Sequence, residues 1–299
     1  MKRTKIAIIG AGSVGSTIAY ALLLKNLAAE ILLVDSNEIR CRGEILDLSD
    51  ALSFCESSSI RSGTPDDARH SDIIIIAAGK RQEPGQDRIA LLKANKKVIE
   101  SVLQSLQPLN KNAIIIMVTN PVDVMTFYAQ QLSGLPKTQV FGSGTFLDSQ
   151  RLRGQLSKKI KVAEQSIHAY ILGEHGDTQF PAWSAARVAG MSLSEFGISQ
   201  KDLEHIAHEV KNKAYEIISC KGATFYGIAT CVAALCRTIM FDQKRVTPVS
   251  CYIKAFNVSL SMPVILGAQG IEEILMIPLS ATEQKHLDRS IETLQSYID

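Results

Sequence analysis

The chain has 299 residues, of which 46% are hydrophobic and 21% are charged, so it is long enough for one large or two medium domains with well-buried cores. This composition excludes a disordered chain, a collagen-like repeat and a fibrous coiled coil. With 32 Lys and Arg against 30 Asp and Glu, the net charge is only +2, which argues against nucleic acid or an anionic membrane as partner. A protein that acts on small molecules is the better expectation.

The sequence also bounds the cellular context. No apolar run approaches the about 18 residues of a membrane-spanning helix, and the first apolar run is too short for a secretory signal. The six cysteines lie far apart, without a CxxC pair and without a histidine at metal-binding spacing. We therefore predict a cytoplasmic protein without a bound metal, whose cysteines are reduced packing residues. They are Cys41, Cys55, Cys220, Cys231, Cys236 and Cys251.

The first half of the chain alternates β-rich apolar runs with amphipathic segments. This rhythm predicts an α/β fold, a doubly wound parallel sheet of the Rossmann type, over residues 1–142. Each run is nearly continuous in apolar residues, as expected when helices cover both faces of the sheet. The clearest strands are Lys5–Ile9, Glu30–Val34, Ile73–Ala77 and Ala113–Val118, and helical spacing predicts a helix over Arg88–Gln107.

From about residue 143 the pattern changes to longer helices followed by β-rich segments. We predict helices over Gln200–Ser219 and Thr224–Phe241, and strands near 246–254, 258–265 and 270–277. A last helix has one apolar face, formed by Leu287, Ile291, Leu294 and Ile298. Residues 143–299 are therefore predicted to form a second, α+β domain.

A glycine-rich turn follows the first strand and opens a helix over Ser13–Leu24. It consists of Gly10, Ala11, Gly12, Ser13, Val14 and Gly15. Gly10 permits the tight turn, Gly12 lets a pyrophosphate approach the backbone, and Gly15 allows the helix to pack closely on the strand. Because the start of a helix also attracts anions, the turn predicts a dinucleotide site rather than a bare glycine-rich turn.

Asp35 ends the second predicted strand, 20 residues after Gly15. A carboxylate there can accept both ribose hydroxyls of NAD and repels the additional phosphate of NADP, so the expected cofactor is NAD. The alternative role of Asp35 is the N-cap of a helix over Asn37–Leu48.

Two further segments carry groups suited to proton transfer. His175 lies in the sequence GEHGD after a predicted strand over Ser166–Leu172, and a histidine in such a turn can exchange a proton near neutral pH. Asp148 and Arg151 are three residues apart and share one side of a helix, where a solvated ion pair is the alternative. The three form a catalytic centre only if the fold brings them together.

Seven motifs in order and spacing resemble the L-lactate/malate dehydrogenase family over nearly the whole chain: GAGSVG, VDSNE, AAGKRQEPGQDR, VTNPVDV, GSGTFLDSQR, GEHGDT and KGATFYGIA. The resemblance implies hydride transfer between NAD and a 2-hydroxy acid. It implies that His175 is the acid/base, that Asp148 fixes its tautomer, and that Arg151 grips the substrate carboxylate with two parallel bonds.

The resemblance extends to the residues around the reacting carbonyl. Arg88, at the end of a mobile loop, is expected to polarise this carbonyl after loop closure, and Asn120 is expected to orient its oxygen. Contacts to the cofactor are expected from Ala78, Gly79 and Asn120, in addition to the glycine-rich turn and Asp35.

In this family the residue six before the loop arginine selects the substrate side chain. Counting back from Arg88 gives Gln82, whose neutral amide favours pyruvate and L-lactate. A malate enzyme is expected to carry arginine there, and a one-residue slip to Arg81 would reverse the assignment. Thr224 fits a small substrate pocket, with a helix cap as its alternative role. Malate dehydrogenase and a non-catalytic NAD-binding protein remain the competing functions.

Arg153 and His168 stand where bacterial members of the family that are activated by fructose 1,6-bisphosphate carry phosphate ligands. The resemblance therefore implies activation by this bisphosphate and a bacterial-type homotetramer, with solvated surface residues as the alternative. The sequence starts directly at its first strand, without the long N-terminal arm of the vertebrate relatives, and on this ground too we expect the bacterial-type tetramer. The segment 249–263 is compressed relative to the family, which leaves its strand pairing open.

Overall fold

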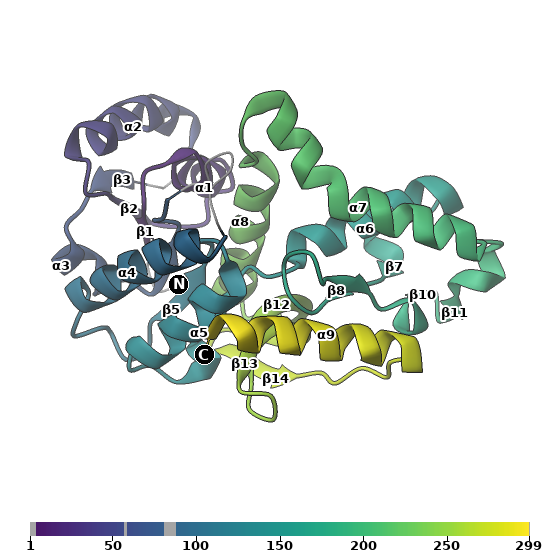
Figure 1. Cartoon of the computed structure of the whole chain (residues 1–299). Helices are drawn as coiled ribbons and strands as arrows, with labels where there is room; N and C mark the ends of the chain where they lie inside the picture. Colours follow the sequence, from purple (N-terminus) through teal and green to yellow (C-terminus); the bar gives the residue numbers. More distant parts are fainter. Residues whose placement is uncertain (1–3, 57–58, 81–87, 299) are drawn as a thin grey trace.

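A computed structural model describes residues 4–56, 59–80 and 88–298, and it has one large sheet at its centre (Figure 1). The strands of this sheet follow the order β14-β13-β12-β6-β5-β4-β1-β2-β3. Helices α1 to α5 surround its parallel part, while α6, α7 and two small sheets form a lobe on the other side of the molecule (Figure 1).

Six strands of the large sheet are parallel. They are β1 (Lys5–Ile9), β2 (Glu30–Val34), β3 (Ser59–Ser62), β4 (Ile73–Ile76), β5 (Ile114–Met117) and β6 (Val140–Gly142). The order in which they lie side by side is that of a Rossmann fold, which confirms the predicted fold class. The four predicted strands are present to within one residue at either end. β3 escaped prediction because it is a polar edge strand in which only Ile60 is buried.

Three antiparallel strands continue the same sheet beyond β6. They are β12 (Arg245–Ile253), β13 (Val258–Gly267) and β14 (Gly270–Ile274). Ser250 of β12 pairs with Gly142 of β6, so the parallel and antiparallel parts share one hydrogen-bonded framework. β12 and β13 pair regularly from Arg245 and Leu266 to Ile253 and Val258, which answers the question left open for the compressed segment.

The α-helices are α1 (Ser13–Leu24), α2 (Glu38–Asp50), α3 (Pro65–Ala68), α4 (Arg88–Ser105), α5 (Val122–Leu132), α6 (Phe146–Ile160), α7 (Gln200–Lys221), α8 (Tyr226–Met240) and α9 (Ala281–Ile298). Short 3-10 turns lie at Ala51–Phe54, Lys137–Gln139, Glu164–Ser166, Trp183–Ala185 and Leu193–Phe196. The predicted helices are confirmed with shifted ends. The ends of α7, for example, are set by a capping box of Ser199 and Asp202 and by Gly222, whose φ is +82°.

The single strand predicted over Ser166–Leu172 is wrong. The chain forms β7 (Ile167–His168), which pairs with β10 (Arg187–Val188), and then β8 (Ile171–Leu172), which pairs with β9 (Phe180–Pro181). A further short strand, β11 (Met191–Ser192), completes the sheet of β7 and β10. An apolar run indicates burial but not the pairing partner, so the change of sheet at Ala169 and Tyr170 leaves no trace in the sequence.

The buried side chains form a large cluster around the nine-stranded sheet and a smaller one between α6, α7 and the small sheets. Cys41, Cys231, Cys236 and Cys251 are buried, as predicted for packing residues. Burial raises the pKa of the last three to about 12, so these thiols stay protonated. The prediction is wrong for exposed Cys220, because α7 buries no residue beyond Val210. Cys55 is half-buried.

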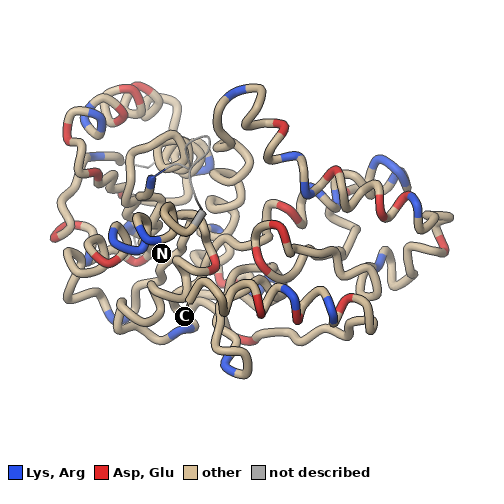
Figure 2. The backbone as a smooth tube through the Cα atoms, viewed as in Figure 1, with Lys and Arg blue, Asp and Glu red and all other residues tan. Residues whose placement is uncertain are grey.

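Acidic and basic residues are interspersed along α7 and α9 instead of gathering by sign (Figure 2). This mixed distribution accords with the net charge of +2. Within the described part of the chain, none of the helices combines the length and the apolar character needed to cross a membrane.

Candidate active site

The glycine-rich turn between β1 and α1 has the geometry of a phosphate-binding turn. Gly10 has φ +110°, and a Cβ atom there would lie 2.7 Å from the backbone nitrogen of Ala78. A Cβ on Gly15 would lie 1.8 Å from the carbonyl oxygen of Gly10, so neither position tolerates a side chain. At Gly12 a Cβ would meet nothing within 4 Å, so the backbone there faces open space.

Helix α1 begins at Ser13, with neither a side-chain cap nor an acidic residue in its first turn. The positive end of the helix dipole, which includes Ser13 and Val14, therefore keeps its attraction for an anion. Together with the open space at Gly12, this arrangement fits the pyrophosphate of a dinucleotide.

Asp35 is tied directly to the glycine-rich turn. Its Oδ2 accepts a hydrogen bond from the backbone N–H of Ala11 at 2.6 Å, and its Oδ1 accepts one from Asn37 at 2.8 Å. Helix α2 is capped by Asn37, whose side chain accepts from the N–H of Arg40. The alternative role of Asp35 as helix N-cap is therefore wrong.

A cavity of about 990 Å³ runs beside the carboxyl ends of β1, β2 and β4, and it is large enough for much of a dinucleotide. Of the predicted cofactor residues, Gly10, Asp35 and Ala78 line it, whereas Gly12, Ser13, Val14, Gly15, Gly79 and Asn120 are not among its lining residues. Lys80, Thr64 and the side chains of α4 complete the wall. Gly79 packs against Thr119, since a Cβ at Gly79 would lie 2.5 Å from the Thr119 methyl group. The residues present thus fit NAD.

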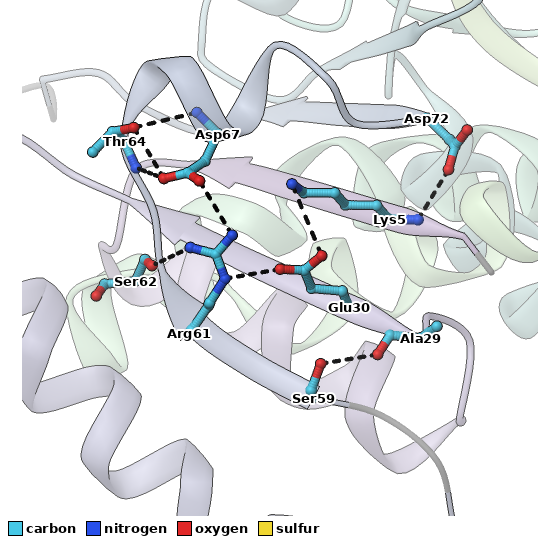
Figure 3. A network of polar contacts seen from close by, with 9 residues as sticks. All are labelled: Lys5, Ala29, Glu30, Ser59, Arg61, Ser62, Thr64, Asp67 and Asp72. Atoms are coloured by element: carbon cyan, nitrogen blue, oxygen red, sulfur yellow. Dashed lines mark hydrogen bonds and ion pairs between the residues drawn. The ribbon is translucent and has the colours of Figure 1, made fainter.

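Thr64, which lines this cavity, belongs to a network of polar contacts (Figure 3). Asp67 Oδ2 accepts hydrogen bonds from the N–H and the hydroxyl of Thr64, both at 2.9 Å. Arg61 donates to Asp67 at 3.2 Å and to Glu30 at 2.8 Å, and Glu30 lies 3.8 Å from the Lys5 ammonium. The hydrogen bonds from Thr64 and Arg61 lower the pKa of Asp67. The network thereby links β1, β2 and β3 to the cavity wall.

Asn95 of α4 is a positioning residue that the sequence analysis did not find. Its buried side chain accepts from the N–H of Lys80 at 2.7 Å and donates to the carbonyl oxygens of Asn120 at 2.8 Å and Lys80 at 3.3 Å. It therefore joins the loop after β4 to the loop after β5, where Asn120 precedes a cis proline. The available signal was an asparagine on the apolar face of a helix, where a buried amide requires polar partners.

The fold brings His175, Asp148 and Arg151 together. Nδ1 of His175 lies 2.8 Å from Oδ2 of Asp148, and Nη1 of Arg151 donates to Oδ1 of Asp148 at 3.1 Å. The side chains of Asp148 and Arg151 are only 2% and 9% exposed, so the alternative of a solvated ion pair is wrong. His175 is 30% exposed and is the member of the cluster that solvent reaches most easily.

Ser261 of β13 anchors both segments that carry this cluster. Its backbone exchanges two hydrogen bonds with Gly173, at 3.1 and 2.9 Å, two residues before His175. Its hydroxyl accepts from the N–H of Thr145, immediately before α6 begins. The relative position of His175 and Asp148 is therefore set by one strand of the large sheet.

The electrostatics of the cluster favour its charged form. Burial and, to a smaller extent, the charge of Arg151 lower the pKa of His175, but the charge and hydrogen bond of Asp148, with a further contribution from Asp123, outweigh them and raise it overall. Burial raises the pKa of Asp148, yet the charge and hydrogen bond of His175 and the charge of Arg151 lower it below its ordinary value. An imidazolium paired with a carboxylate is the result.

Of the remaining predicted substrate residues, the structure describes only some. Gln82 and the side chain of Arg88 lie outside the described residues. Thr224 is half-buried in the loop between α7 and α8. It does not cap α8, because the N-cap position is Phe225 and no side-chain cap is present, so that alternative is wrong.

Of the two predicted phosphate ligands, one is buried and one exposed. Arg153 donates through Nε to the carbonyl oxygen of Ala169 at 3.1 Å, and its guanidinium lies 5.2 Å from the centre of the Tyr170 ring. Burial lowers its pKa, so Arg153 is not a solvated surface residue. His168 is exposed on β7, opposite Arg187 of β10.

Comparison with known proteins settles the family. Residues 4–142 match the description "lactate/malate dehydrogenase, NAD binding domain", and residues 145–299 match "lactate/malate dehydrogenase, alpha/beta C-terminal domain". The chain belongs to the lactate/malate dehydrogenase family. The cofactor of this lactate/malate dehydrogenase family member is NAD, and the protein is an NAD-dependent oxidoreductase.

Several relatives in this family are similar over their whole length. L-lactate dehydrogenase A of Rhizopus oryzae is 45% identical, over 98% of this chain and 92% of the relative. An L-lactate dehydrogenase of Clostridium botulinum (strain 657 / Type Ba4) is 40% identical over 99% and 96%. The crystal structure of MGS-M5, a lactate dehydrogenase from a Medee basin deep-sea metagenome library, has a TM-score of 0.96 at 35% identity, covering 100% of this chain and 99% of its own.

A second solved structure is equally similar in fold. The minor L-lactate dehydrogenase of Enterococcus mundtii, in a ligand-bound form, has a TM-score of 0.96 at 34% identity, covering 100% of this chain and 98% of its own. Together with the strand order, these similarities show a Rossmann-like sheet followed by an α/β C-terminal part.

Proposed function

We propose that this protein is an L-lactate dehydrogenase, which interconverts pyruvate and L-lactate with NAD in the cytoplasm. The observation that carries the proposal is the buried carboxylate of Asp148, which contacts His175 at 2.8 Å and Arg151 at 3.1 Å. The same carboxylate thereby positions a proton donor, His175, and a guanidinium that can bind an anion, Arg151. The relatives named L-lactate dehydrogenase, at 40% and 45% identity over nearly the whole chain, support the substrate.

His175 is the acid/base of the proposed reaction. Because Asp148 faces Nδ1, that nitrogen keeps its proton and Nε2 is the nitrogen that exchanges a proton with the substrate oxygen. The raised pKa of His175 favours the protonated form that pyruvate reduction requires. Arg151 uses its remaining N–H groups to bind the substrate carboxylate. NAD, when bound, supplies the hydride for reduction or accepts it in oxidation.

The other site residues complete the pocket. Gly10, Gly12, Ser13, Val14 and Gly15 hold the pyrophosphate, and Asp35 holds the ribose. Ala78, Gly79 and Asn120 contact the nicotinamide side of the cofactor. Arg88 stabilises charge on the reacting oxygen, Asn120 orients this oxygen, and Thr224 borders the substrate methyl group.

Gln82 is the residue we propose to select pyruvate over oxaloacetate, because a second carboxylate left unpaired in a closed site costs several kcal/mol, on the order of 3. The direct test measures kcat/KM for both keto acids with NADH, in the wild type and in Gln82→Arg. The wild type should prefer pyruvate, and the variant should shift the ratio toward oxaloacetate by about 100-fold or more. A wild-type preference for oxaloacetate would identify a malate dehydrogenase instead.

His175→Asn tests the assignment of His175 as the acid/base. The variant should bind NADH with unchanged affinity while pyruvate turnover falls by about 10²–10⁴-fold, the usual contribution of general acid–base catalysis. If the wild type bound NADH but consumed none with pyruvate or oxaloacetate, the protein would be a non-catalytic NAD-binding protein.

We further propose that fructose 1,6-bisphosphate activates the enzyme and that the enzyme is a homotetramer. The guanidinium of Arg153 contacts the carbonyl oxygen of Ala169, one residue from exposed His168, so both side chains lie near the same end of β7. Exposed apolar side chains on α1 and α2 support self-association: Tyr20, Leu24, Ile39 and Leu46. We also propose a division of labour in which residues 1–142 bind NAD and residues 143–299 bind substrate.

A further inference from the structure

A second carboxylate, which has no role in the proposed site so far, contacts the segment that carries His175. Asp123 lies in the first turn of α5 and is 2% exposed. Its Oδ2 accepts a hydrogen bond from the backbone N–H of His175 at 2.6 Å. His175 is therefore held from two sides, by Asp148 at its ring and by Asp123 at its main chain.

The surroundings of Asp123 are poorly suited to a negative charge. Burial raises the pKa of Asp123 to about 6, although Ser250 and the N–H and charge of His175 lower it, and the charge of Glu174 raises it further. From β12, the thiol of buried Cys251 also faces this carboxylate and stays protonated. Among the described residues, neither Asp123 Oδ1 nor Ser250 Oγ makes a hydrogen bond of ordinary geometry.

A purely structural role does not explain why a charged residue is buried at this position. A single backbone N–H is satisfied equally well by the amide oxygen of asparagine, which avoids the cost of burying an ion. The charge of Asp123 acts favourably on one group, His175, whose pKa it raises. The ion is thus retained at the position where it stabilises an imidazolium.

We propose that Asp123 is a positioning residue for the acid/base histidine, which fixes the main chain of His175 and adds a second negative charge that stabilises its protonated ring. This inference rests on the proposed role of His175. Asp123 is proposed to touch neither substrate nor cofactor. It acts through His175 alone, while Asp148 sets the tautomer of the ring.

Two variants separate position from charge. Asp123→Asn keeps an oxygen acceptor for the His175 N–H but removes the charge, whereas Asp123→Ala removes both. Glu283→Gln is the matched control, because Glu283 is a buried carboxylate that accepts hydrogen bonds from Ser184 and Ser280, away from His175. Thermal unfolding of each purified variant establishes that it is folded.

The measurements are the pH profile of kcat/KM for pyruvate reduction and the NMR titration of the His175 ring. In Asp123→Asn the alkaline limb should move to lower pH, so that activity falls roughly three- to tenfold at high pH and less than about twofold on the acid plateau. Asp123→Ala should show the same shift and, because the loop is misplaced, a kcat about 100-fold lower at every pH. KM for NADH should change little in either variant.

An Asp123→Asn enzyme whose pH profile and His175 titration coincide with those of the wild type overturns the proposal. The proposal fails equally if Glu283→Gln shifts the profile as much as Asp123→Asn. If the wild type does not reduce pyruvate, the proposed function fails, yet the NMR titration of His175 in the same variants still decides whether Asp123 acts on this ring.

Discussion

Asp148 is the residue on which the candidate site depends. Its two oxygens bind different partners, the imidazole of His175 and the guanidinium of Arg151, and all three side chains come from α6 and the segment after β8. The buried carboxylate has no spare oxygen, so each partner fixes the orientation of the other. Removing its charge should therefore disturb both proton transfer and binding of the substrate carboxylate.

Asp148→Asn tests this dependence. The amide keeps the size of the side chain but no longer balances the two cations, so kcat/KM for pyruvate should fall about 100-fold or more. We expect kcat to fall and KM to rise, since His175 and Arg151 are affected together. Glu209→Gln, at an exposed carboxylate on α7, serves as the control in steady-state kinetics. A variant with altered kcat and an unchanged KM would show that Arg151 does not depend on Asp148.

The raised pKa of His175 predicts the pH dependence of both reaction directions. Pyruvate reduction needs the imidazolium, so its kcat/KM should persist above the ordinary histidine pKa of 6.5 and decline as pH rises through the raised value. Lactate oxidation needs the neutral ring and should increase over the same range. Initial rates in both directions across this range test the prediction. A decline in pyruvate reduction at or below pH 6.5 would contradict it.

The sequence identified some site residues and missed others for a physical reason. His175, Asp148 and Arg151 stand in short polar motifs that interrupt the apolar pattern. Asn95 of α4 and Asp123 of α5 are buried, and each contacts the backbone of a segment that is distant in sequence. The separation is 25 residues for Asn95 and Asn120 and 52 residues for Asp123 and His175. No local pattern encodes such contacts.

At the scale of whole elements, the strands that a local pattern marks were predicted, whereas strand pairings that depend on distant partners were not. The four continuous apolar runs were predicted well because burial on both faces of a parallel sheet leaves a strong signature. The segment 166–172 was predicted wrongly as one strand. Its apolar residues form a single run in the sequence, although β7 and β8 belong to different sheets. The pairing of β12 with β13 could not be predicted from either segment alone, because the register depends on both strands.

Helix α4 provides an element-level prediction through Asn95. Asn95→Ala removes three hydrogen bonds that join the loops after β4 and β5, so the free energy of unfolding should fall by about 1–3 kcal/mol. KM for NADH should rise, because Lys80 lines the cofactor cavity. Denaturant unfolding and NADH titration measure the two effects. Asn212→Ala, at a half-buried position on α7, is the control.

If Asn95→Ala lost stability without any change in NADH binding, the loop connection would be structural alone. A change in NADH binding at unchanged stability would contradict the hydrogen-bond argument instead.

At the scale of the whole molecule, the proposed regulation makes a direct prediction. Fructose 1,6-bisphosphate should lower the half-saturation concentration for pyruvate and favour the tetramer, measured by kinetics and by sedimentation in parallel. His168→Ala should weaken this response, whereas His205→Ala, at an exposed position on α7, should keep it. No change in either measurement on adding the bisphosphate to the wild type would remove the proposal.

The pairing of Gly142 with Ser250 makes residues from both halves of the chain parts of one hydrogen-bonded sheet. Such a chain should melt as a single cooperative unit, with one endotherm in a calorimetric scan. NADH bound at the glycine-rich turn should then delay the loss of structure at α9 as much as at α1. A chain severed between Gly142 and Ser143 should accordingly yield fragments that aggregate apart and recover native fluorescence only when refolded together.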